Sequence, residues 1–71
     1  MTQCQPDFTL IAQRIKEKRT AKGMTQEKLA EHADVSTNFI GYVETGRKRA
    51  KFTTLWKIAA ALDTTIDGLS L

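Results

Sequence analysis

Apolar side chains recur along the chain at intervals of three and four residues, the spacing of one face of an α-helix. The first group, Ile11, Ala12 and Ile15, is followed by mostly polar residues up to Lys22. Gly23 then stands where a helix C-terminus needs a residue in the left-handed conformation. The pattern therefore predicts a first helix that ends near Lys22.

The middle of the chain predicts two short helices separated by a tight turn. Thr25 and Ser36 are of the residue types that cap helix N-termini, and Asp34-Val35 links the two segments. The apolar faces consist of Leu29, Ala30 and Ala33 in the first segment and of Ile40 and Val43 in the second. Two helices joined by three or four residues are typical of a helix-turn-helix unit.

The last third of the chain predicts a fourth helix and a final helical turn. Thr53 is suited to cap the fourth helix, and Thr64 or Thr65 precedes the final turn. The inward faces consist of Leu55, Ile58, Ala59 and Leu62, then of Ile66 and Leu69. The pattern predicts no strand, so we expect an all-α domain of five short helices over residues 8–71, preceded by a flexible tail at residues 1–7.

Length and composition restrict the class of protein. A chain of 71 residues has room for one hydrophobic core but not for a second domain. Its 41% hydrophobic and 27% charged residues are ordinary for a folded domain, and no apolar run approaches the ~20 residues of a membrane span. Cys4 and His32 are too few for a disulfide or a structural metal site. We expect a soluble, cytoplasmic protein without a metal, a cofactor or a membrane partner.

Charge is distributed in blocks within a net charge of +3. Residues 14–28 hold six basic and two acidic side chains, and residues 29–45 hold three acidic side chains without Lys or Arg. Residues 46–57 hold five basic side chains without Asp or Glu. Such runs occur on solvated helix faces as well as on surfaces that bind phosphate groups, so charge alone leaves both interpretations open.

The third predicted helix has an uncharged outer face. Opposite its apolar side lie small or hydrogen-bonding residues, namely Asn38, Gly41, Tyr42 and Thr45, with Thr37 at the edge of this face. Amide, hydroxyl and ring groups suit contacts with base edges, and the flanking cations suit contacts with phosphates. A glycine inside a helix costs about 1 kcal/mol relative to alanine, so Gly41 indicates either close approach of a duplex or simple tolerance.

The chain from about Ile11 to Leu69 resembles the Xre family, the phage repressor and Cro type of helix-turn-helix proteins. The similarity rests on Gly23-Met24-Thr25-Gln26, Leu29-Ala30, Val35-Ser36, Val43-Glu44 and Gly46, among other positions. Asp34 stands where the turn glycine is commonest, and Ala50 stands where a proline often enters the following loop. The resemblance implies a five-helix, lambda-repressor-like DNA-binding domain in which the second and third helices form the helix-turn-helix.

The resemblance and the side-chain chemistry together indicate two groups of DNA contacts. For reading bases we expect a recognition helix at about residues 36–45, with Ser36, Thr37, Asn38 and Tyr42. For binding the phosphate backbone we expect Thr25, Gln26, Lys28, Arg47, Lys48, Arg49 and Lys51. Similar proteins use the start of the second helix and the loop after the third helix in this way. Solvated side chains and a plain helix start are the alternatives for this second group.

Two further sets of residues have predicted structural roles. Arg19 and Glu44 occupy positions that pair in similar proteins, so the resemblance implies an internal ion pair that fixes a helix angle. The residues Trp56, Ile66, Leu69 and Leu71 supply more apolar area near the C-terminus than one small domain needs to bury. This surplus favours a homodimer, and a place at the edge of the core is the alternative for Trp56.

We therefore expect a sequence-specific transcriptional regulator that binds double-stranded DNA as a homodimer at a near-palindromic operator. Restriction-modification controllers and small prophage repressors are the two kinds of regulator that it resembles. The sequence shows no catalytic pair or cofactor loop, so we expect neither an enzyme nor a small-molecule effector. The alternative from another class is an antitoxin or other protein-interaction module with the same fold.

Overall fold

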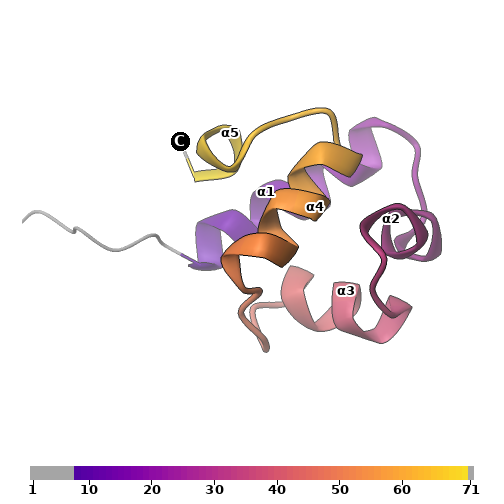
Figure 1. Ribbon diagram of the computed structural model, residues 1–71, viewed down its shortest axis with the longest axis horizontal. Helices are drawn as coiled ribbons and strands as arrows, with labels where there is room; N and C mark the ends of the chain where they lie inside the picture. The colour runs from indigo at the N-terminus through magenta and orange to yellow at the C-terminus, as the bar shows by residue number, and fades with distance from the viewer. Residues whose placement is uncertain (1–7, 71) are drawn as a thin grey trace, which may run out of the picture.

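The computed structural model describes residues 8–70, which contain five helices and no strand. The predicted tail at residues 1–7 and the interface candidate Leu71 lie outside the described residues. The helices are α1 (Phe8–Ala21), α2 (Gln26–Ala33), α3 (Thr37–Glu44), α4 (Phe52–Ala61) and α5 (Ile66–Ser70). This arrangement confirms the predicted all-α fold with five helices (Figure 1). None of these helices combines the length and the apolar character that crossing a membrane requires.

Side-chain caps start α2 and α3 at the residues that the sequence indicates. The hydroxyl oxygen of Thr25 accepts the N–H of Lys28 at 3.0 Å, and that of Ser36 accepts the N–H of Phe39 at 3.0 Å. Each such cap is worth about 1 kcal/mol. In the turn between the two helices, Asp34 takes the left-handed conformation (φ 59°, ψ 46°), which an aspartate tolerates. Local chemistry thus sets the geometry of the helix-turn-helix.

The predicted cap of the fourth helix is wrong. Helix α4 begins at Phe52, and Lys51 occupies its N-cap position without a side-chain hydrogen bond. The backbone already closes a helical turn there, because the N–H of Leu55 donates to the carbonyl oxygen of Lys51 at 2.8 Å. Thr53 therefore lies inside the first turn, and Phe52 belongs to the helix instead of the preceding loop.

The core lies where the helices meet. Helix α2 packs against α3 and α4, and α1 packs against α3 and α5 (Figure 1). The largest fully buried side chains come one from each helix and are Ile15, Leu29, Ile40, Ile58 and Leu69. Full burial of an aliphatic side chain of this size contributes about 1.5–3 kcal/mol, so each helix is anchored by one such residue.

The position of Leu69 corrects one part of the predicted dimer surface. Leu69 is 0% exposed, so it belongs to the core and is not available to a partner. Its helix has five residues and is too short to be stable alone, which is why its leucine must dock it on the other helices. Ile66, at the start of the same helix, is only partly buried and reaches the surface.

An exposed ion pair joins the chain segments that follow α1 and α4. Lys22 Nζ lies 2.6 Å from Asp63 Oδ2. The hydrogen bond from Lys22, together with its positive charge, lowers the pKa of the Asp63 carboxyl below its ordinary value of 3.8. Water screens both side chains, so the contact adds little to stability.

Candidate nucleic-acid interface

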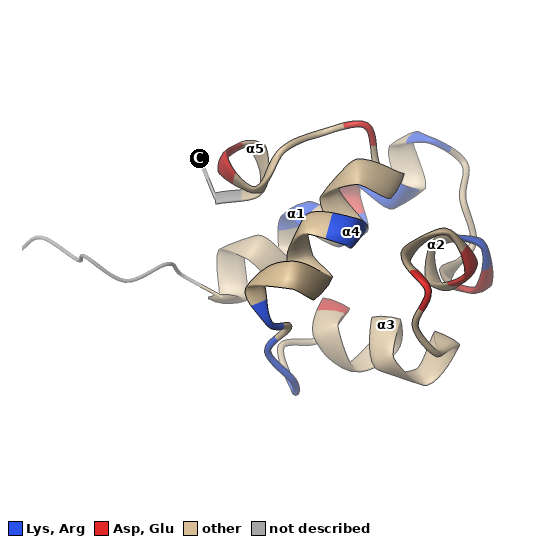
Figure 2. Cartoon of the chain, in the orientation of Figure 1, with Lys and Arg blue, Asp and Glu red and all other residues tan. Residues whose placement is uncertain are grey.

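The outer face of α3 forms part of an open hollow. The hollow has a volume of about 250 Å³ and is lined by Gln26, Thr37, Asn38, Gly41, Tyr42, Thr45 and Arg47. Helix α3 carries one charged residue, the buried Glu44, whereas the loop that follows it is basic. Figure 2 shows this contrast as a largely tan helix beside a blue loop. An uncharged surface bordered by cations is therefore present at α3.

Three of the four predicted base-reading residues line this hollow. Asn38 and Tyr42 are exposed, and Thr37 is partly exposed. Ser36 is not among the lining residues, and its hydroxyl oxygen already accepts the N–H of Phe39. The structure therefore gathers amide, hydroxyl and phenol groups of α3 on one surface and uses Ser36 to start the helix.

Gly41 leaves space open on this surface. A Cβ atom placed on Gly41 would lie 3.8 Å from Gln26 Oε1, which is an ordinary van der Waals distance. The protein itself therefore has room for an alanine at this position. The choice of glycine nevertheless costs the helix about 0.5–1 kcal/mol.

The variant Gly41→Ala separates the two explanations of this glycine. We expect it to raise the free energy of unfolding by about 0.5–1 kcal/mol, because alanine is the better helix former and meets no clash. If α3 lies against a duplex, the added methyl group obstructs the approach and weakens DNA binding. Urea unfolding measures the first effect, and fluorescence anisotropy with a labelled duplex measures the second. Unchanged DNA affinity would contradict close approach at Gly41.

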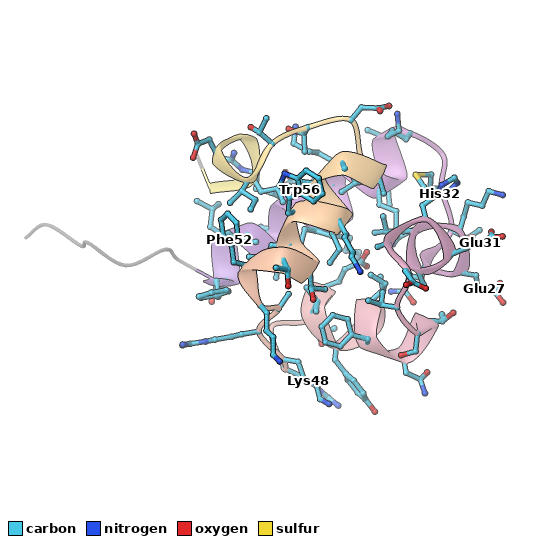
Figure 3. All side chains as sticks on the ribbon, in the orientation of Figure 1. Glu27, Glu31, His32, Lys48, Phe52 and Trp56 are labelled. Atoms are coloured by element: carbon cyan, nitrogen blue, oxygen red, sulfur yellow. The ribbon has the colours of Figure 1, made fainter. Side chains whose placement is uncertain are left out.

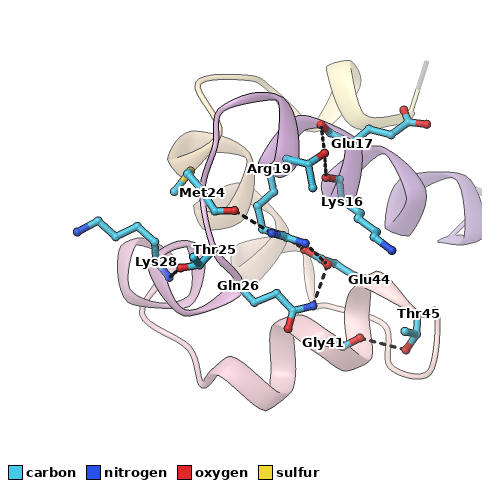
Figure 4. Close-up of polar contacts among 11 residues, drawn as sticks. Lys16, Glu17, Arg19, Met24, Thr25, Gln26, Lys28, Gly41, Glu44 and Thr45 are labelled. Atoms are coloured by element: carbon cyan, nitrogen blue, oxygen red, sulfur yellow. Dashed lines mark hydrogen bonds and ion pairs between the residues drawn. The ribbon is translucent and has the colours of Figure 1, made fainter.

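Behind this surface, Arg19 of α1 forms a two-point ion pair with Glu44 of α3 (Figure 4). Arg19 Nε lies 2.6 Å from Glu44 Oε2, and Arg19 Nη2 lies 3.2 Å from Glu44 Oε1. The third guanidinium nitrogen, Nη1, donates to the carbonyl oxygen of Met24 at 2.8 Å. Both charged residues are buried, and the pair that the resemblance implies is present.

Gln26, the first residue of α2, joins this pair. Its Nε2 donates to Glu44 Oε1 at 3.0 Å. Within residues 8–70, no buried side-chain nitrogen or oxygen lacks a hydrogen-bond partner, so the buried polar atoms of this network are all hydrogen-bonded. The network ties the start of α2 to the end of α3 and both to α1.

The basic loop after α3 is held at both ends. Gly46 takes the left-handed conformation (φ 76°), and its N–H donates to the carbonyl oxygen of Val43 at 3.1 Å. The N–H of Arg47 donates to the carbonyl oxygen of Tyr42 at 2.8 Å, which completes the Schellman arrangement of a helix C-terminus. At the other end Ala50 is buried, 6% exposed. Both ends of the loop are therefore anchored, although Ala50 stands where the resemblance leads one to expect a proline.

The cations of this loop reach two sides of the molecule. Arg47 lines the hollow, and Lys48 Nζ lies 5.6 Å from the centre of the Tyr42 ring. Arg49 instead lies over the ring of Phe8 in α1, with 4.9 Å between its guanidinium carbon and the ring centre. Positive charge therefore extends from the border of the uncharged face of α3 toward the start of α1.

The remaining backbone-binding candidates are exposed or partly exposed near helix starts. At α2 these are Thr25, Gln26 and Lys28, and at α4 the candidate is Lys51. Lys28 Nζ lies 3.5 Å from Glu31 Oε1 in an exposed pair of the kind that contributes little to stability. Figure 3 shows His32, Glu27 and Glu31 pointing away from α3 and α4. No group of three or more His, Cys, Asp and Glu side chains within the described part of the chain is placed to hold a metal ion.

An aromatic surface lies on α4 and is formed by Phe52 and Trp56. Of these two residues, the sequence analysis predicts only Trp56 as part of an interface. Phe52 and Trp56 are 70% and 63% exposed, and together with residues that include Ile66 they line an open groove of about 300 Å³. Figure 3 shows both rings on the side of α4 toward α5, whereas Lys48 lies on the side of α3. Phe52 precedes Trp56 by four residues and so shares its helical face, but this is apparent only when α4 is known to begin at Phe52.

Comparison with known proteins places this architecture in a family. The HTH_3 family model, described as helix-turn-helix, matches residues 15–69. The restriction-modification controller protein C.AhdI from Aeromonas hydrophila has 36% sequence identity and a TM-score of 0.85, over 89% of this chain and 96% of its own. Among curated protein sequences there is no match.

Two further solved structures have the same fold. The wild-type restriction-modification controller protein C.Esp1396I has 26% identity and a TM-score of 0.80, over 87% of this chain and 82% of its own. The clp gene regulator ClgR from Corynebacterium glutamicum has 26% identity and a TM-score of 0.84, over 87% of this chain and 66% of its own. Since the family model spans well over half of the sequence, the chain belongs to the Xre type of the helix-turn-helix family.

Proposed function

We propose that this protein is a DNA-binding regulator of transcription that inserts α3 into the major groove. The observation that carries the proposal is the uncharged, hollowed outer face of α3 with exposed cations beside it. Base edges present neutral donors and acceptors while the strands present phosphates, so this surface matches both parts of a duplex. The similarity to C.AhdI and C.Esp1396I supports a controller protein in preference to a prophage repressor.

The chemistry of each side chain suggests its contact. Asn38 suits two hydrogen bonds to adenine, Thr37 suits the methyl group of thymine, and Tyr42 suits either kind of contact. The backbone group consists of Thr25, Lys28, Arg47, Lys48, Arg49 and Lys51, which bind phosphates. Ser36 contributes by starting the recognition helix. Gln26 is set apart from this group by its hydrogen bond to Glu44.

The variants Asn38→Ala and Arg47→Ala test this division. Asn38→Ala should relax base preference at one position of each half-site by about 1–3 kcal/mol, because it removes a base contact. Arg47→Ala should weaken binding to all sequences alike and reduce the slope of log affinity against log salt by about one unit. In-vitro selection of duplexes, followed by anisotropy titrations at several salt concentrations, measures both effects. Identical behaviour of the two variants would contradict the separation of base-reading from backbone-binding residues.

We also propose that the protein acts as a homodimer on a near-palindromic operator. The exposed rings of Phe52 and Trp56 form an apolar surface of the kind that marks an interface. This surface lies toward α5 and away from Lys48 and α3 (Figure 3), so a second copy docked there leaves the hollow open. A two-fold dimer would present its two α3 helices to successive major grooves about 34 Å apart.

A protein-interaction module is the second candidate function, because the same aromatic surface could bind an unrelated protein instead of a second copy. Salt titration separates the two functions. A DNA-binding regulator loses duplex affinity steeply as salt rises, since each phosphate contact releases counterions. A module that binds only proteins shows no preference among duplexes at any salt concentration.

A further inference from the structure

Gln26 stands at the junction of the buried ion pair and the outer face of α3, and its hydrogen bonds indicate how it contacts DNA. We propose that Glu44 is a positioning residue that holds the side-chain amide of Gln26 with its nitrogen inward and its oxygen outward. Gln26 then recognises an amino group on a base edge instead of a phosphate. This inference rests on the proposed DNA-binding function.

Charge determines the orientation of the Gln26 amide. The carboxylate of Glu44 offers only acceptor oxygens, and Arg19 already donates to both of them, at 2.6 and 3.2 Å. The amide nitrogen of Gln26 donates to Glu44 Oε1 at 3.0 Å. Turning the amide over would place its oxygen at that distance from a carboxylate oxygen, with no hydrogen between them. The buried ion pair therefore fixes which end of Gln26 faces outward.

The side chain of Gln26 contributes to the same hollow as the outer face of α3. Gln26 lines the same hollow as Thr37 and Asn38. Its Oε1 and Nε2 lie 3.8 and 4.0 Å from the position that a Cβ on Gly41 would occupy. Because Gly41 has no side chain, the space next to this amide on α3 is open. The hollow is thus lined by the amide of Gln26, which is held through its nitrogen, and by the side chain of Asn38.

A carbonyl oxygen in this position selects its partner by chemistry. Phosphate oxygens are acceptors, so they cannot donate a hydrogen bond to it. In the major groove, the donors are the N6 amino group of adenine and the N4 amino group of cytosine. The second hydrogen on Gln26 Nε2 is the competing group, because donation from it to a phosphate would give a contact without sequence preference.

The experiment compares base preferences on duplexes that the wild-type protein selects from a random pool. Gln26→Met keeps the side-chain length and removes both polar ends of the amide. We expect it to lose about fivefold to tenfold of the preference for one adenine or cytosine in each half-site, with an unchanged salt slope. Replacing that base by purine or 2-pyrimidinone deletes only its amino group. This replacement should weaken the wild type by the same factor and leave Gln26→Met unaffected.

Two further variants test whether the lost base preference comes from the Gln26 amide. Asn38→Ala is the matched control, because its loss of preference should fall at a different base. Glu44→Gln should lose preference at the same base as Gln26→Met, and the double variant should discriminate as Gln26→Met alone does, because both act through one amide. Circular dichroism checks the folding of Glu44→Gln. If that variant does not fold, Gln26→Met and the base analogues still decide the question.

Three outcomes would overturn the inference. The first is a uniform loss of affinity by Gln26→Met with a salt slope smaller by about one unit, which would indicate a phosphate contact. The second is unchanged base preference in Gln26→Met. The third is a wild-type protein that selects no duplex, which would contradict the proposed function itself and is thereby distinguished from the first two.

Discussion

Glu44→Ala should lower the free energy of unfolding by about 3–5 kcal/mol, because it leaves the guanidinium of Arg19 buried without its carboxylate. The side chains of Arg19 and Glu44 are only 11% and 2% exposed, so little water reaches the site to replace the lost contacts. Domains commonly have total stabilities of about 5–15 kcal/mol, so this loss is a large part of the whole. Urea unfolding monitored by circular dichroism measures it.

Two controls separate the buried charge from other effects. Glu31→Gln breaks the exposed pair with Lys28 and should cost at most about 1 kcal/mol. Replacing both buried partners, as Arg19→Met with Glu44→Leu, should recover most of the stability that Glu44→Ala loses, because no unpaired charge remains in the interior. A double replacement as unstable as Glu44→Ala would contradict this explanation.

Trp56→Glu should convert the proposed homodimer into monomers and lower affinity for a two-half-site operator by about 10²–10⁴-fold. Trp56 is 63% exposed and is not part of the buried core, so its replacement removes little packing from one subunit. In the proposed dimer, however, the new carboxylate would have to leave water and lie against apolar side chains such as Phe52. Analytical ultracentrifugation measures the oligomeric state, and anisotropy with the selected operator measures the affinity.

His32→Glu is the matched control for the added acidic group. His32 is exposed on α2 and points away from α3 and α4 (Figure 3), so its replacement reports only the effect of negative charge on DNA affinity. Trp56→Glu should bind far more weakly than His32→Glu. A dimeric Trp56→Glu protein with the affinity of His32→Glu would contradict the proposed position of the dimer surface.

The parts of the fold that depend on neighbouring residues can be predicted from the sequence. The caps at Thr25 and Ser36 and the left-handed Gly23 are local features, and the structure contains all three. The start of α4 could not be predicted, because Lys51 occupies its N-cap position without a side-chain hydrogen bond. Leu69 shows a second limit, since an apolar residue in a short helix serves a core or an interface equally well until packing is known.

The candidate site also has some features that the sequence predicts and others that depend on how the helices pack. The helical period alone places Asn38, Gly41 and Tyr42 on one face of α3, as the structure does. The orientation of Gln26 could not be inferred, because Gln26 and Glu44 are 18 residues apart and meet only when three helices pack together. The pairing of Arg19 with Glu44 likewise required a resemblance to known proteins, since spacing gives no signal for it.

The residues of α3 that pack into the core are not the ones that face outward. Ile40, Val43 and Glu44 are buried, whereas Asn38 and Tyr42 project from the opposite side and contribute little to the core. Substitutions at the outward positions therefore leave the scaffold nearly as stable as before. During evolution, a few mutations at these positions can therefore change what the outer face of α3 binds without unfolding the protein.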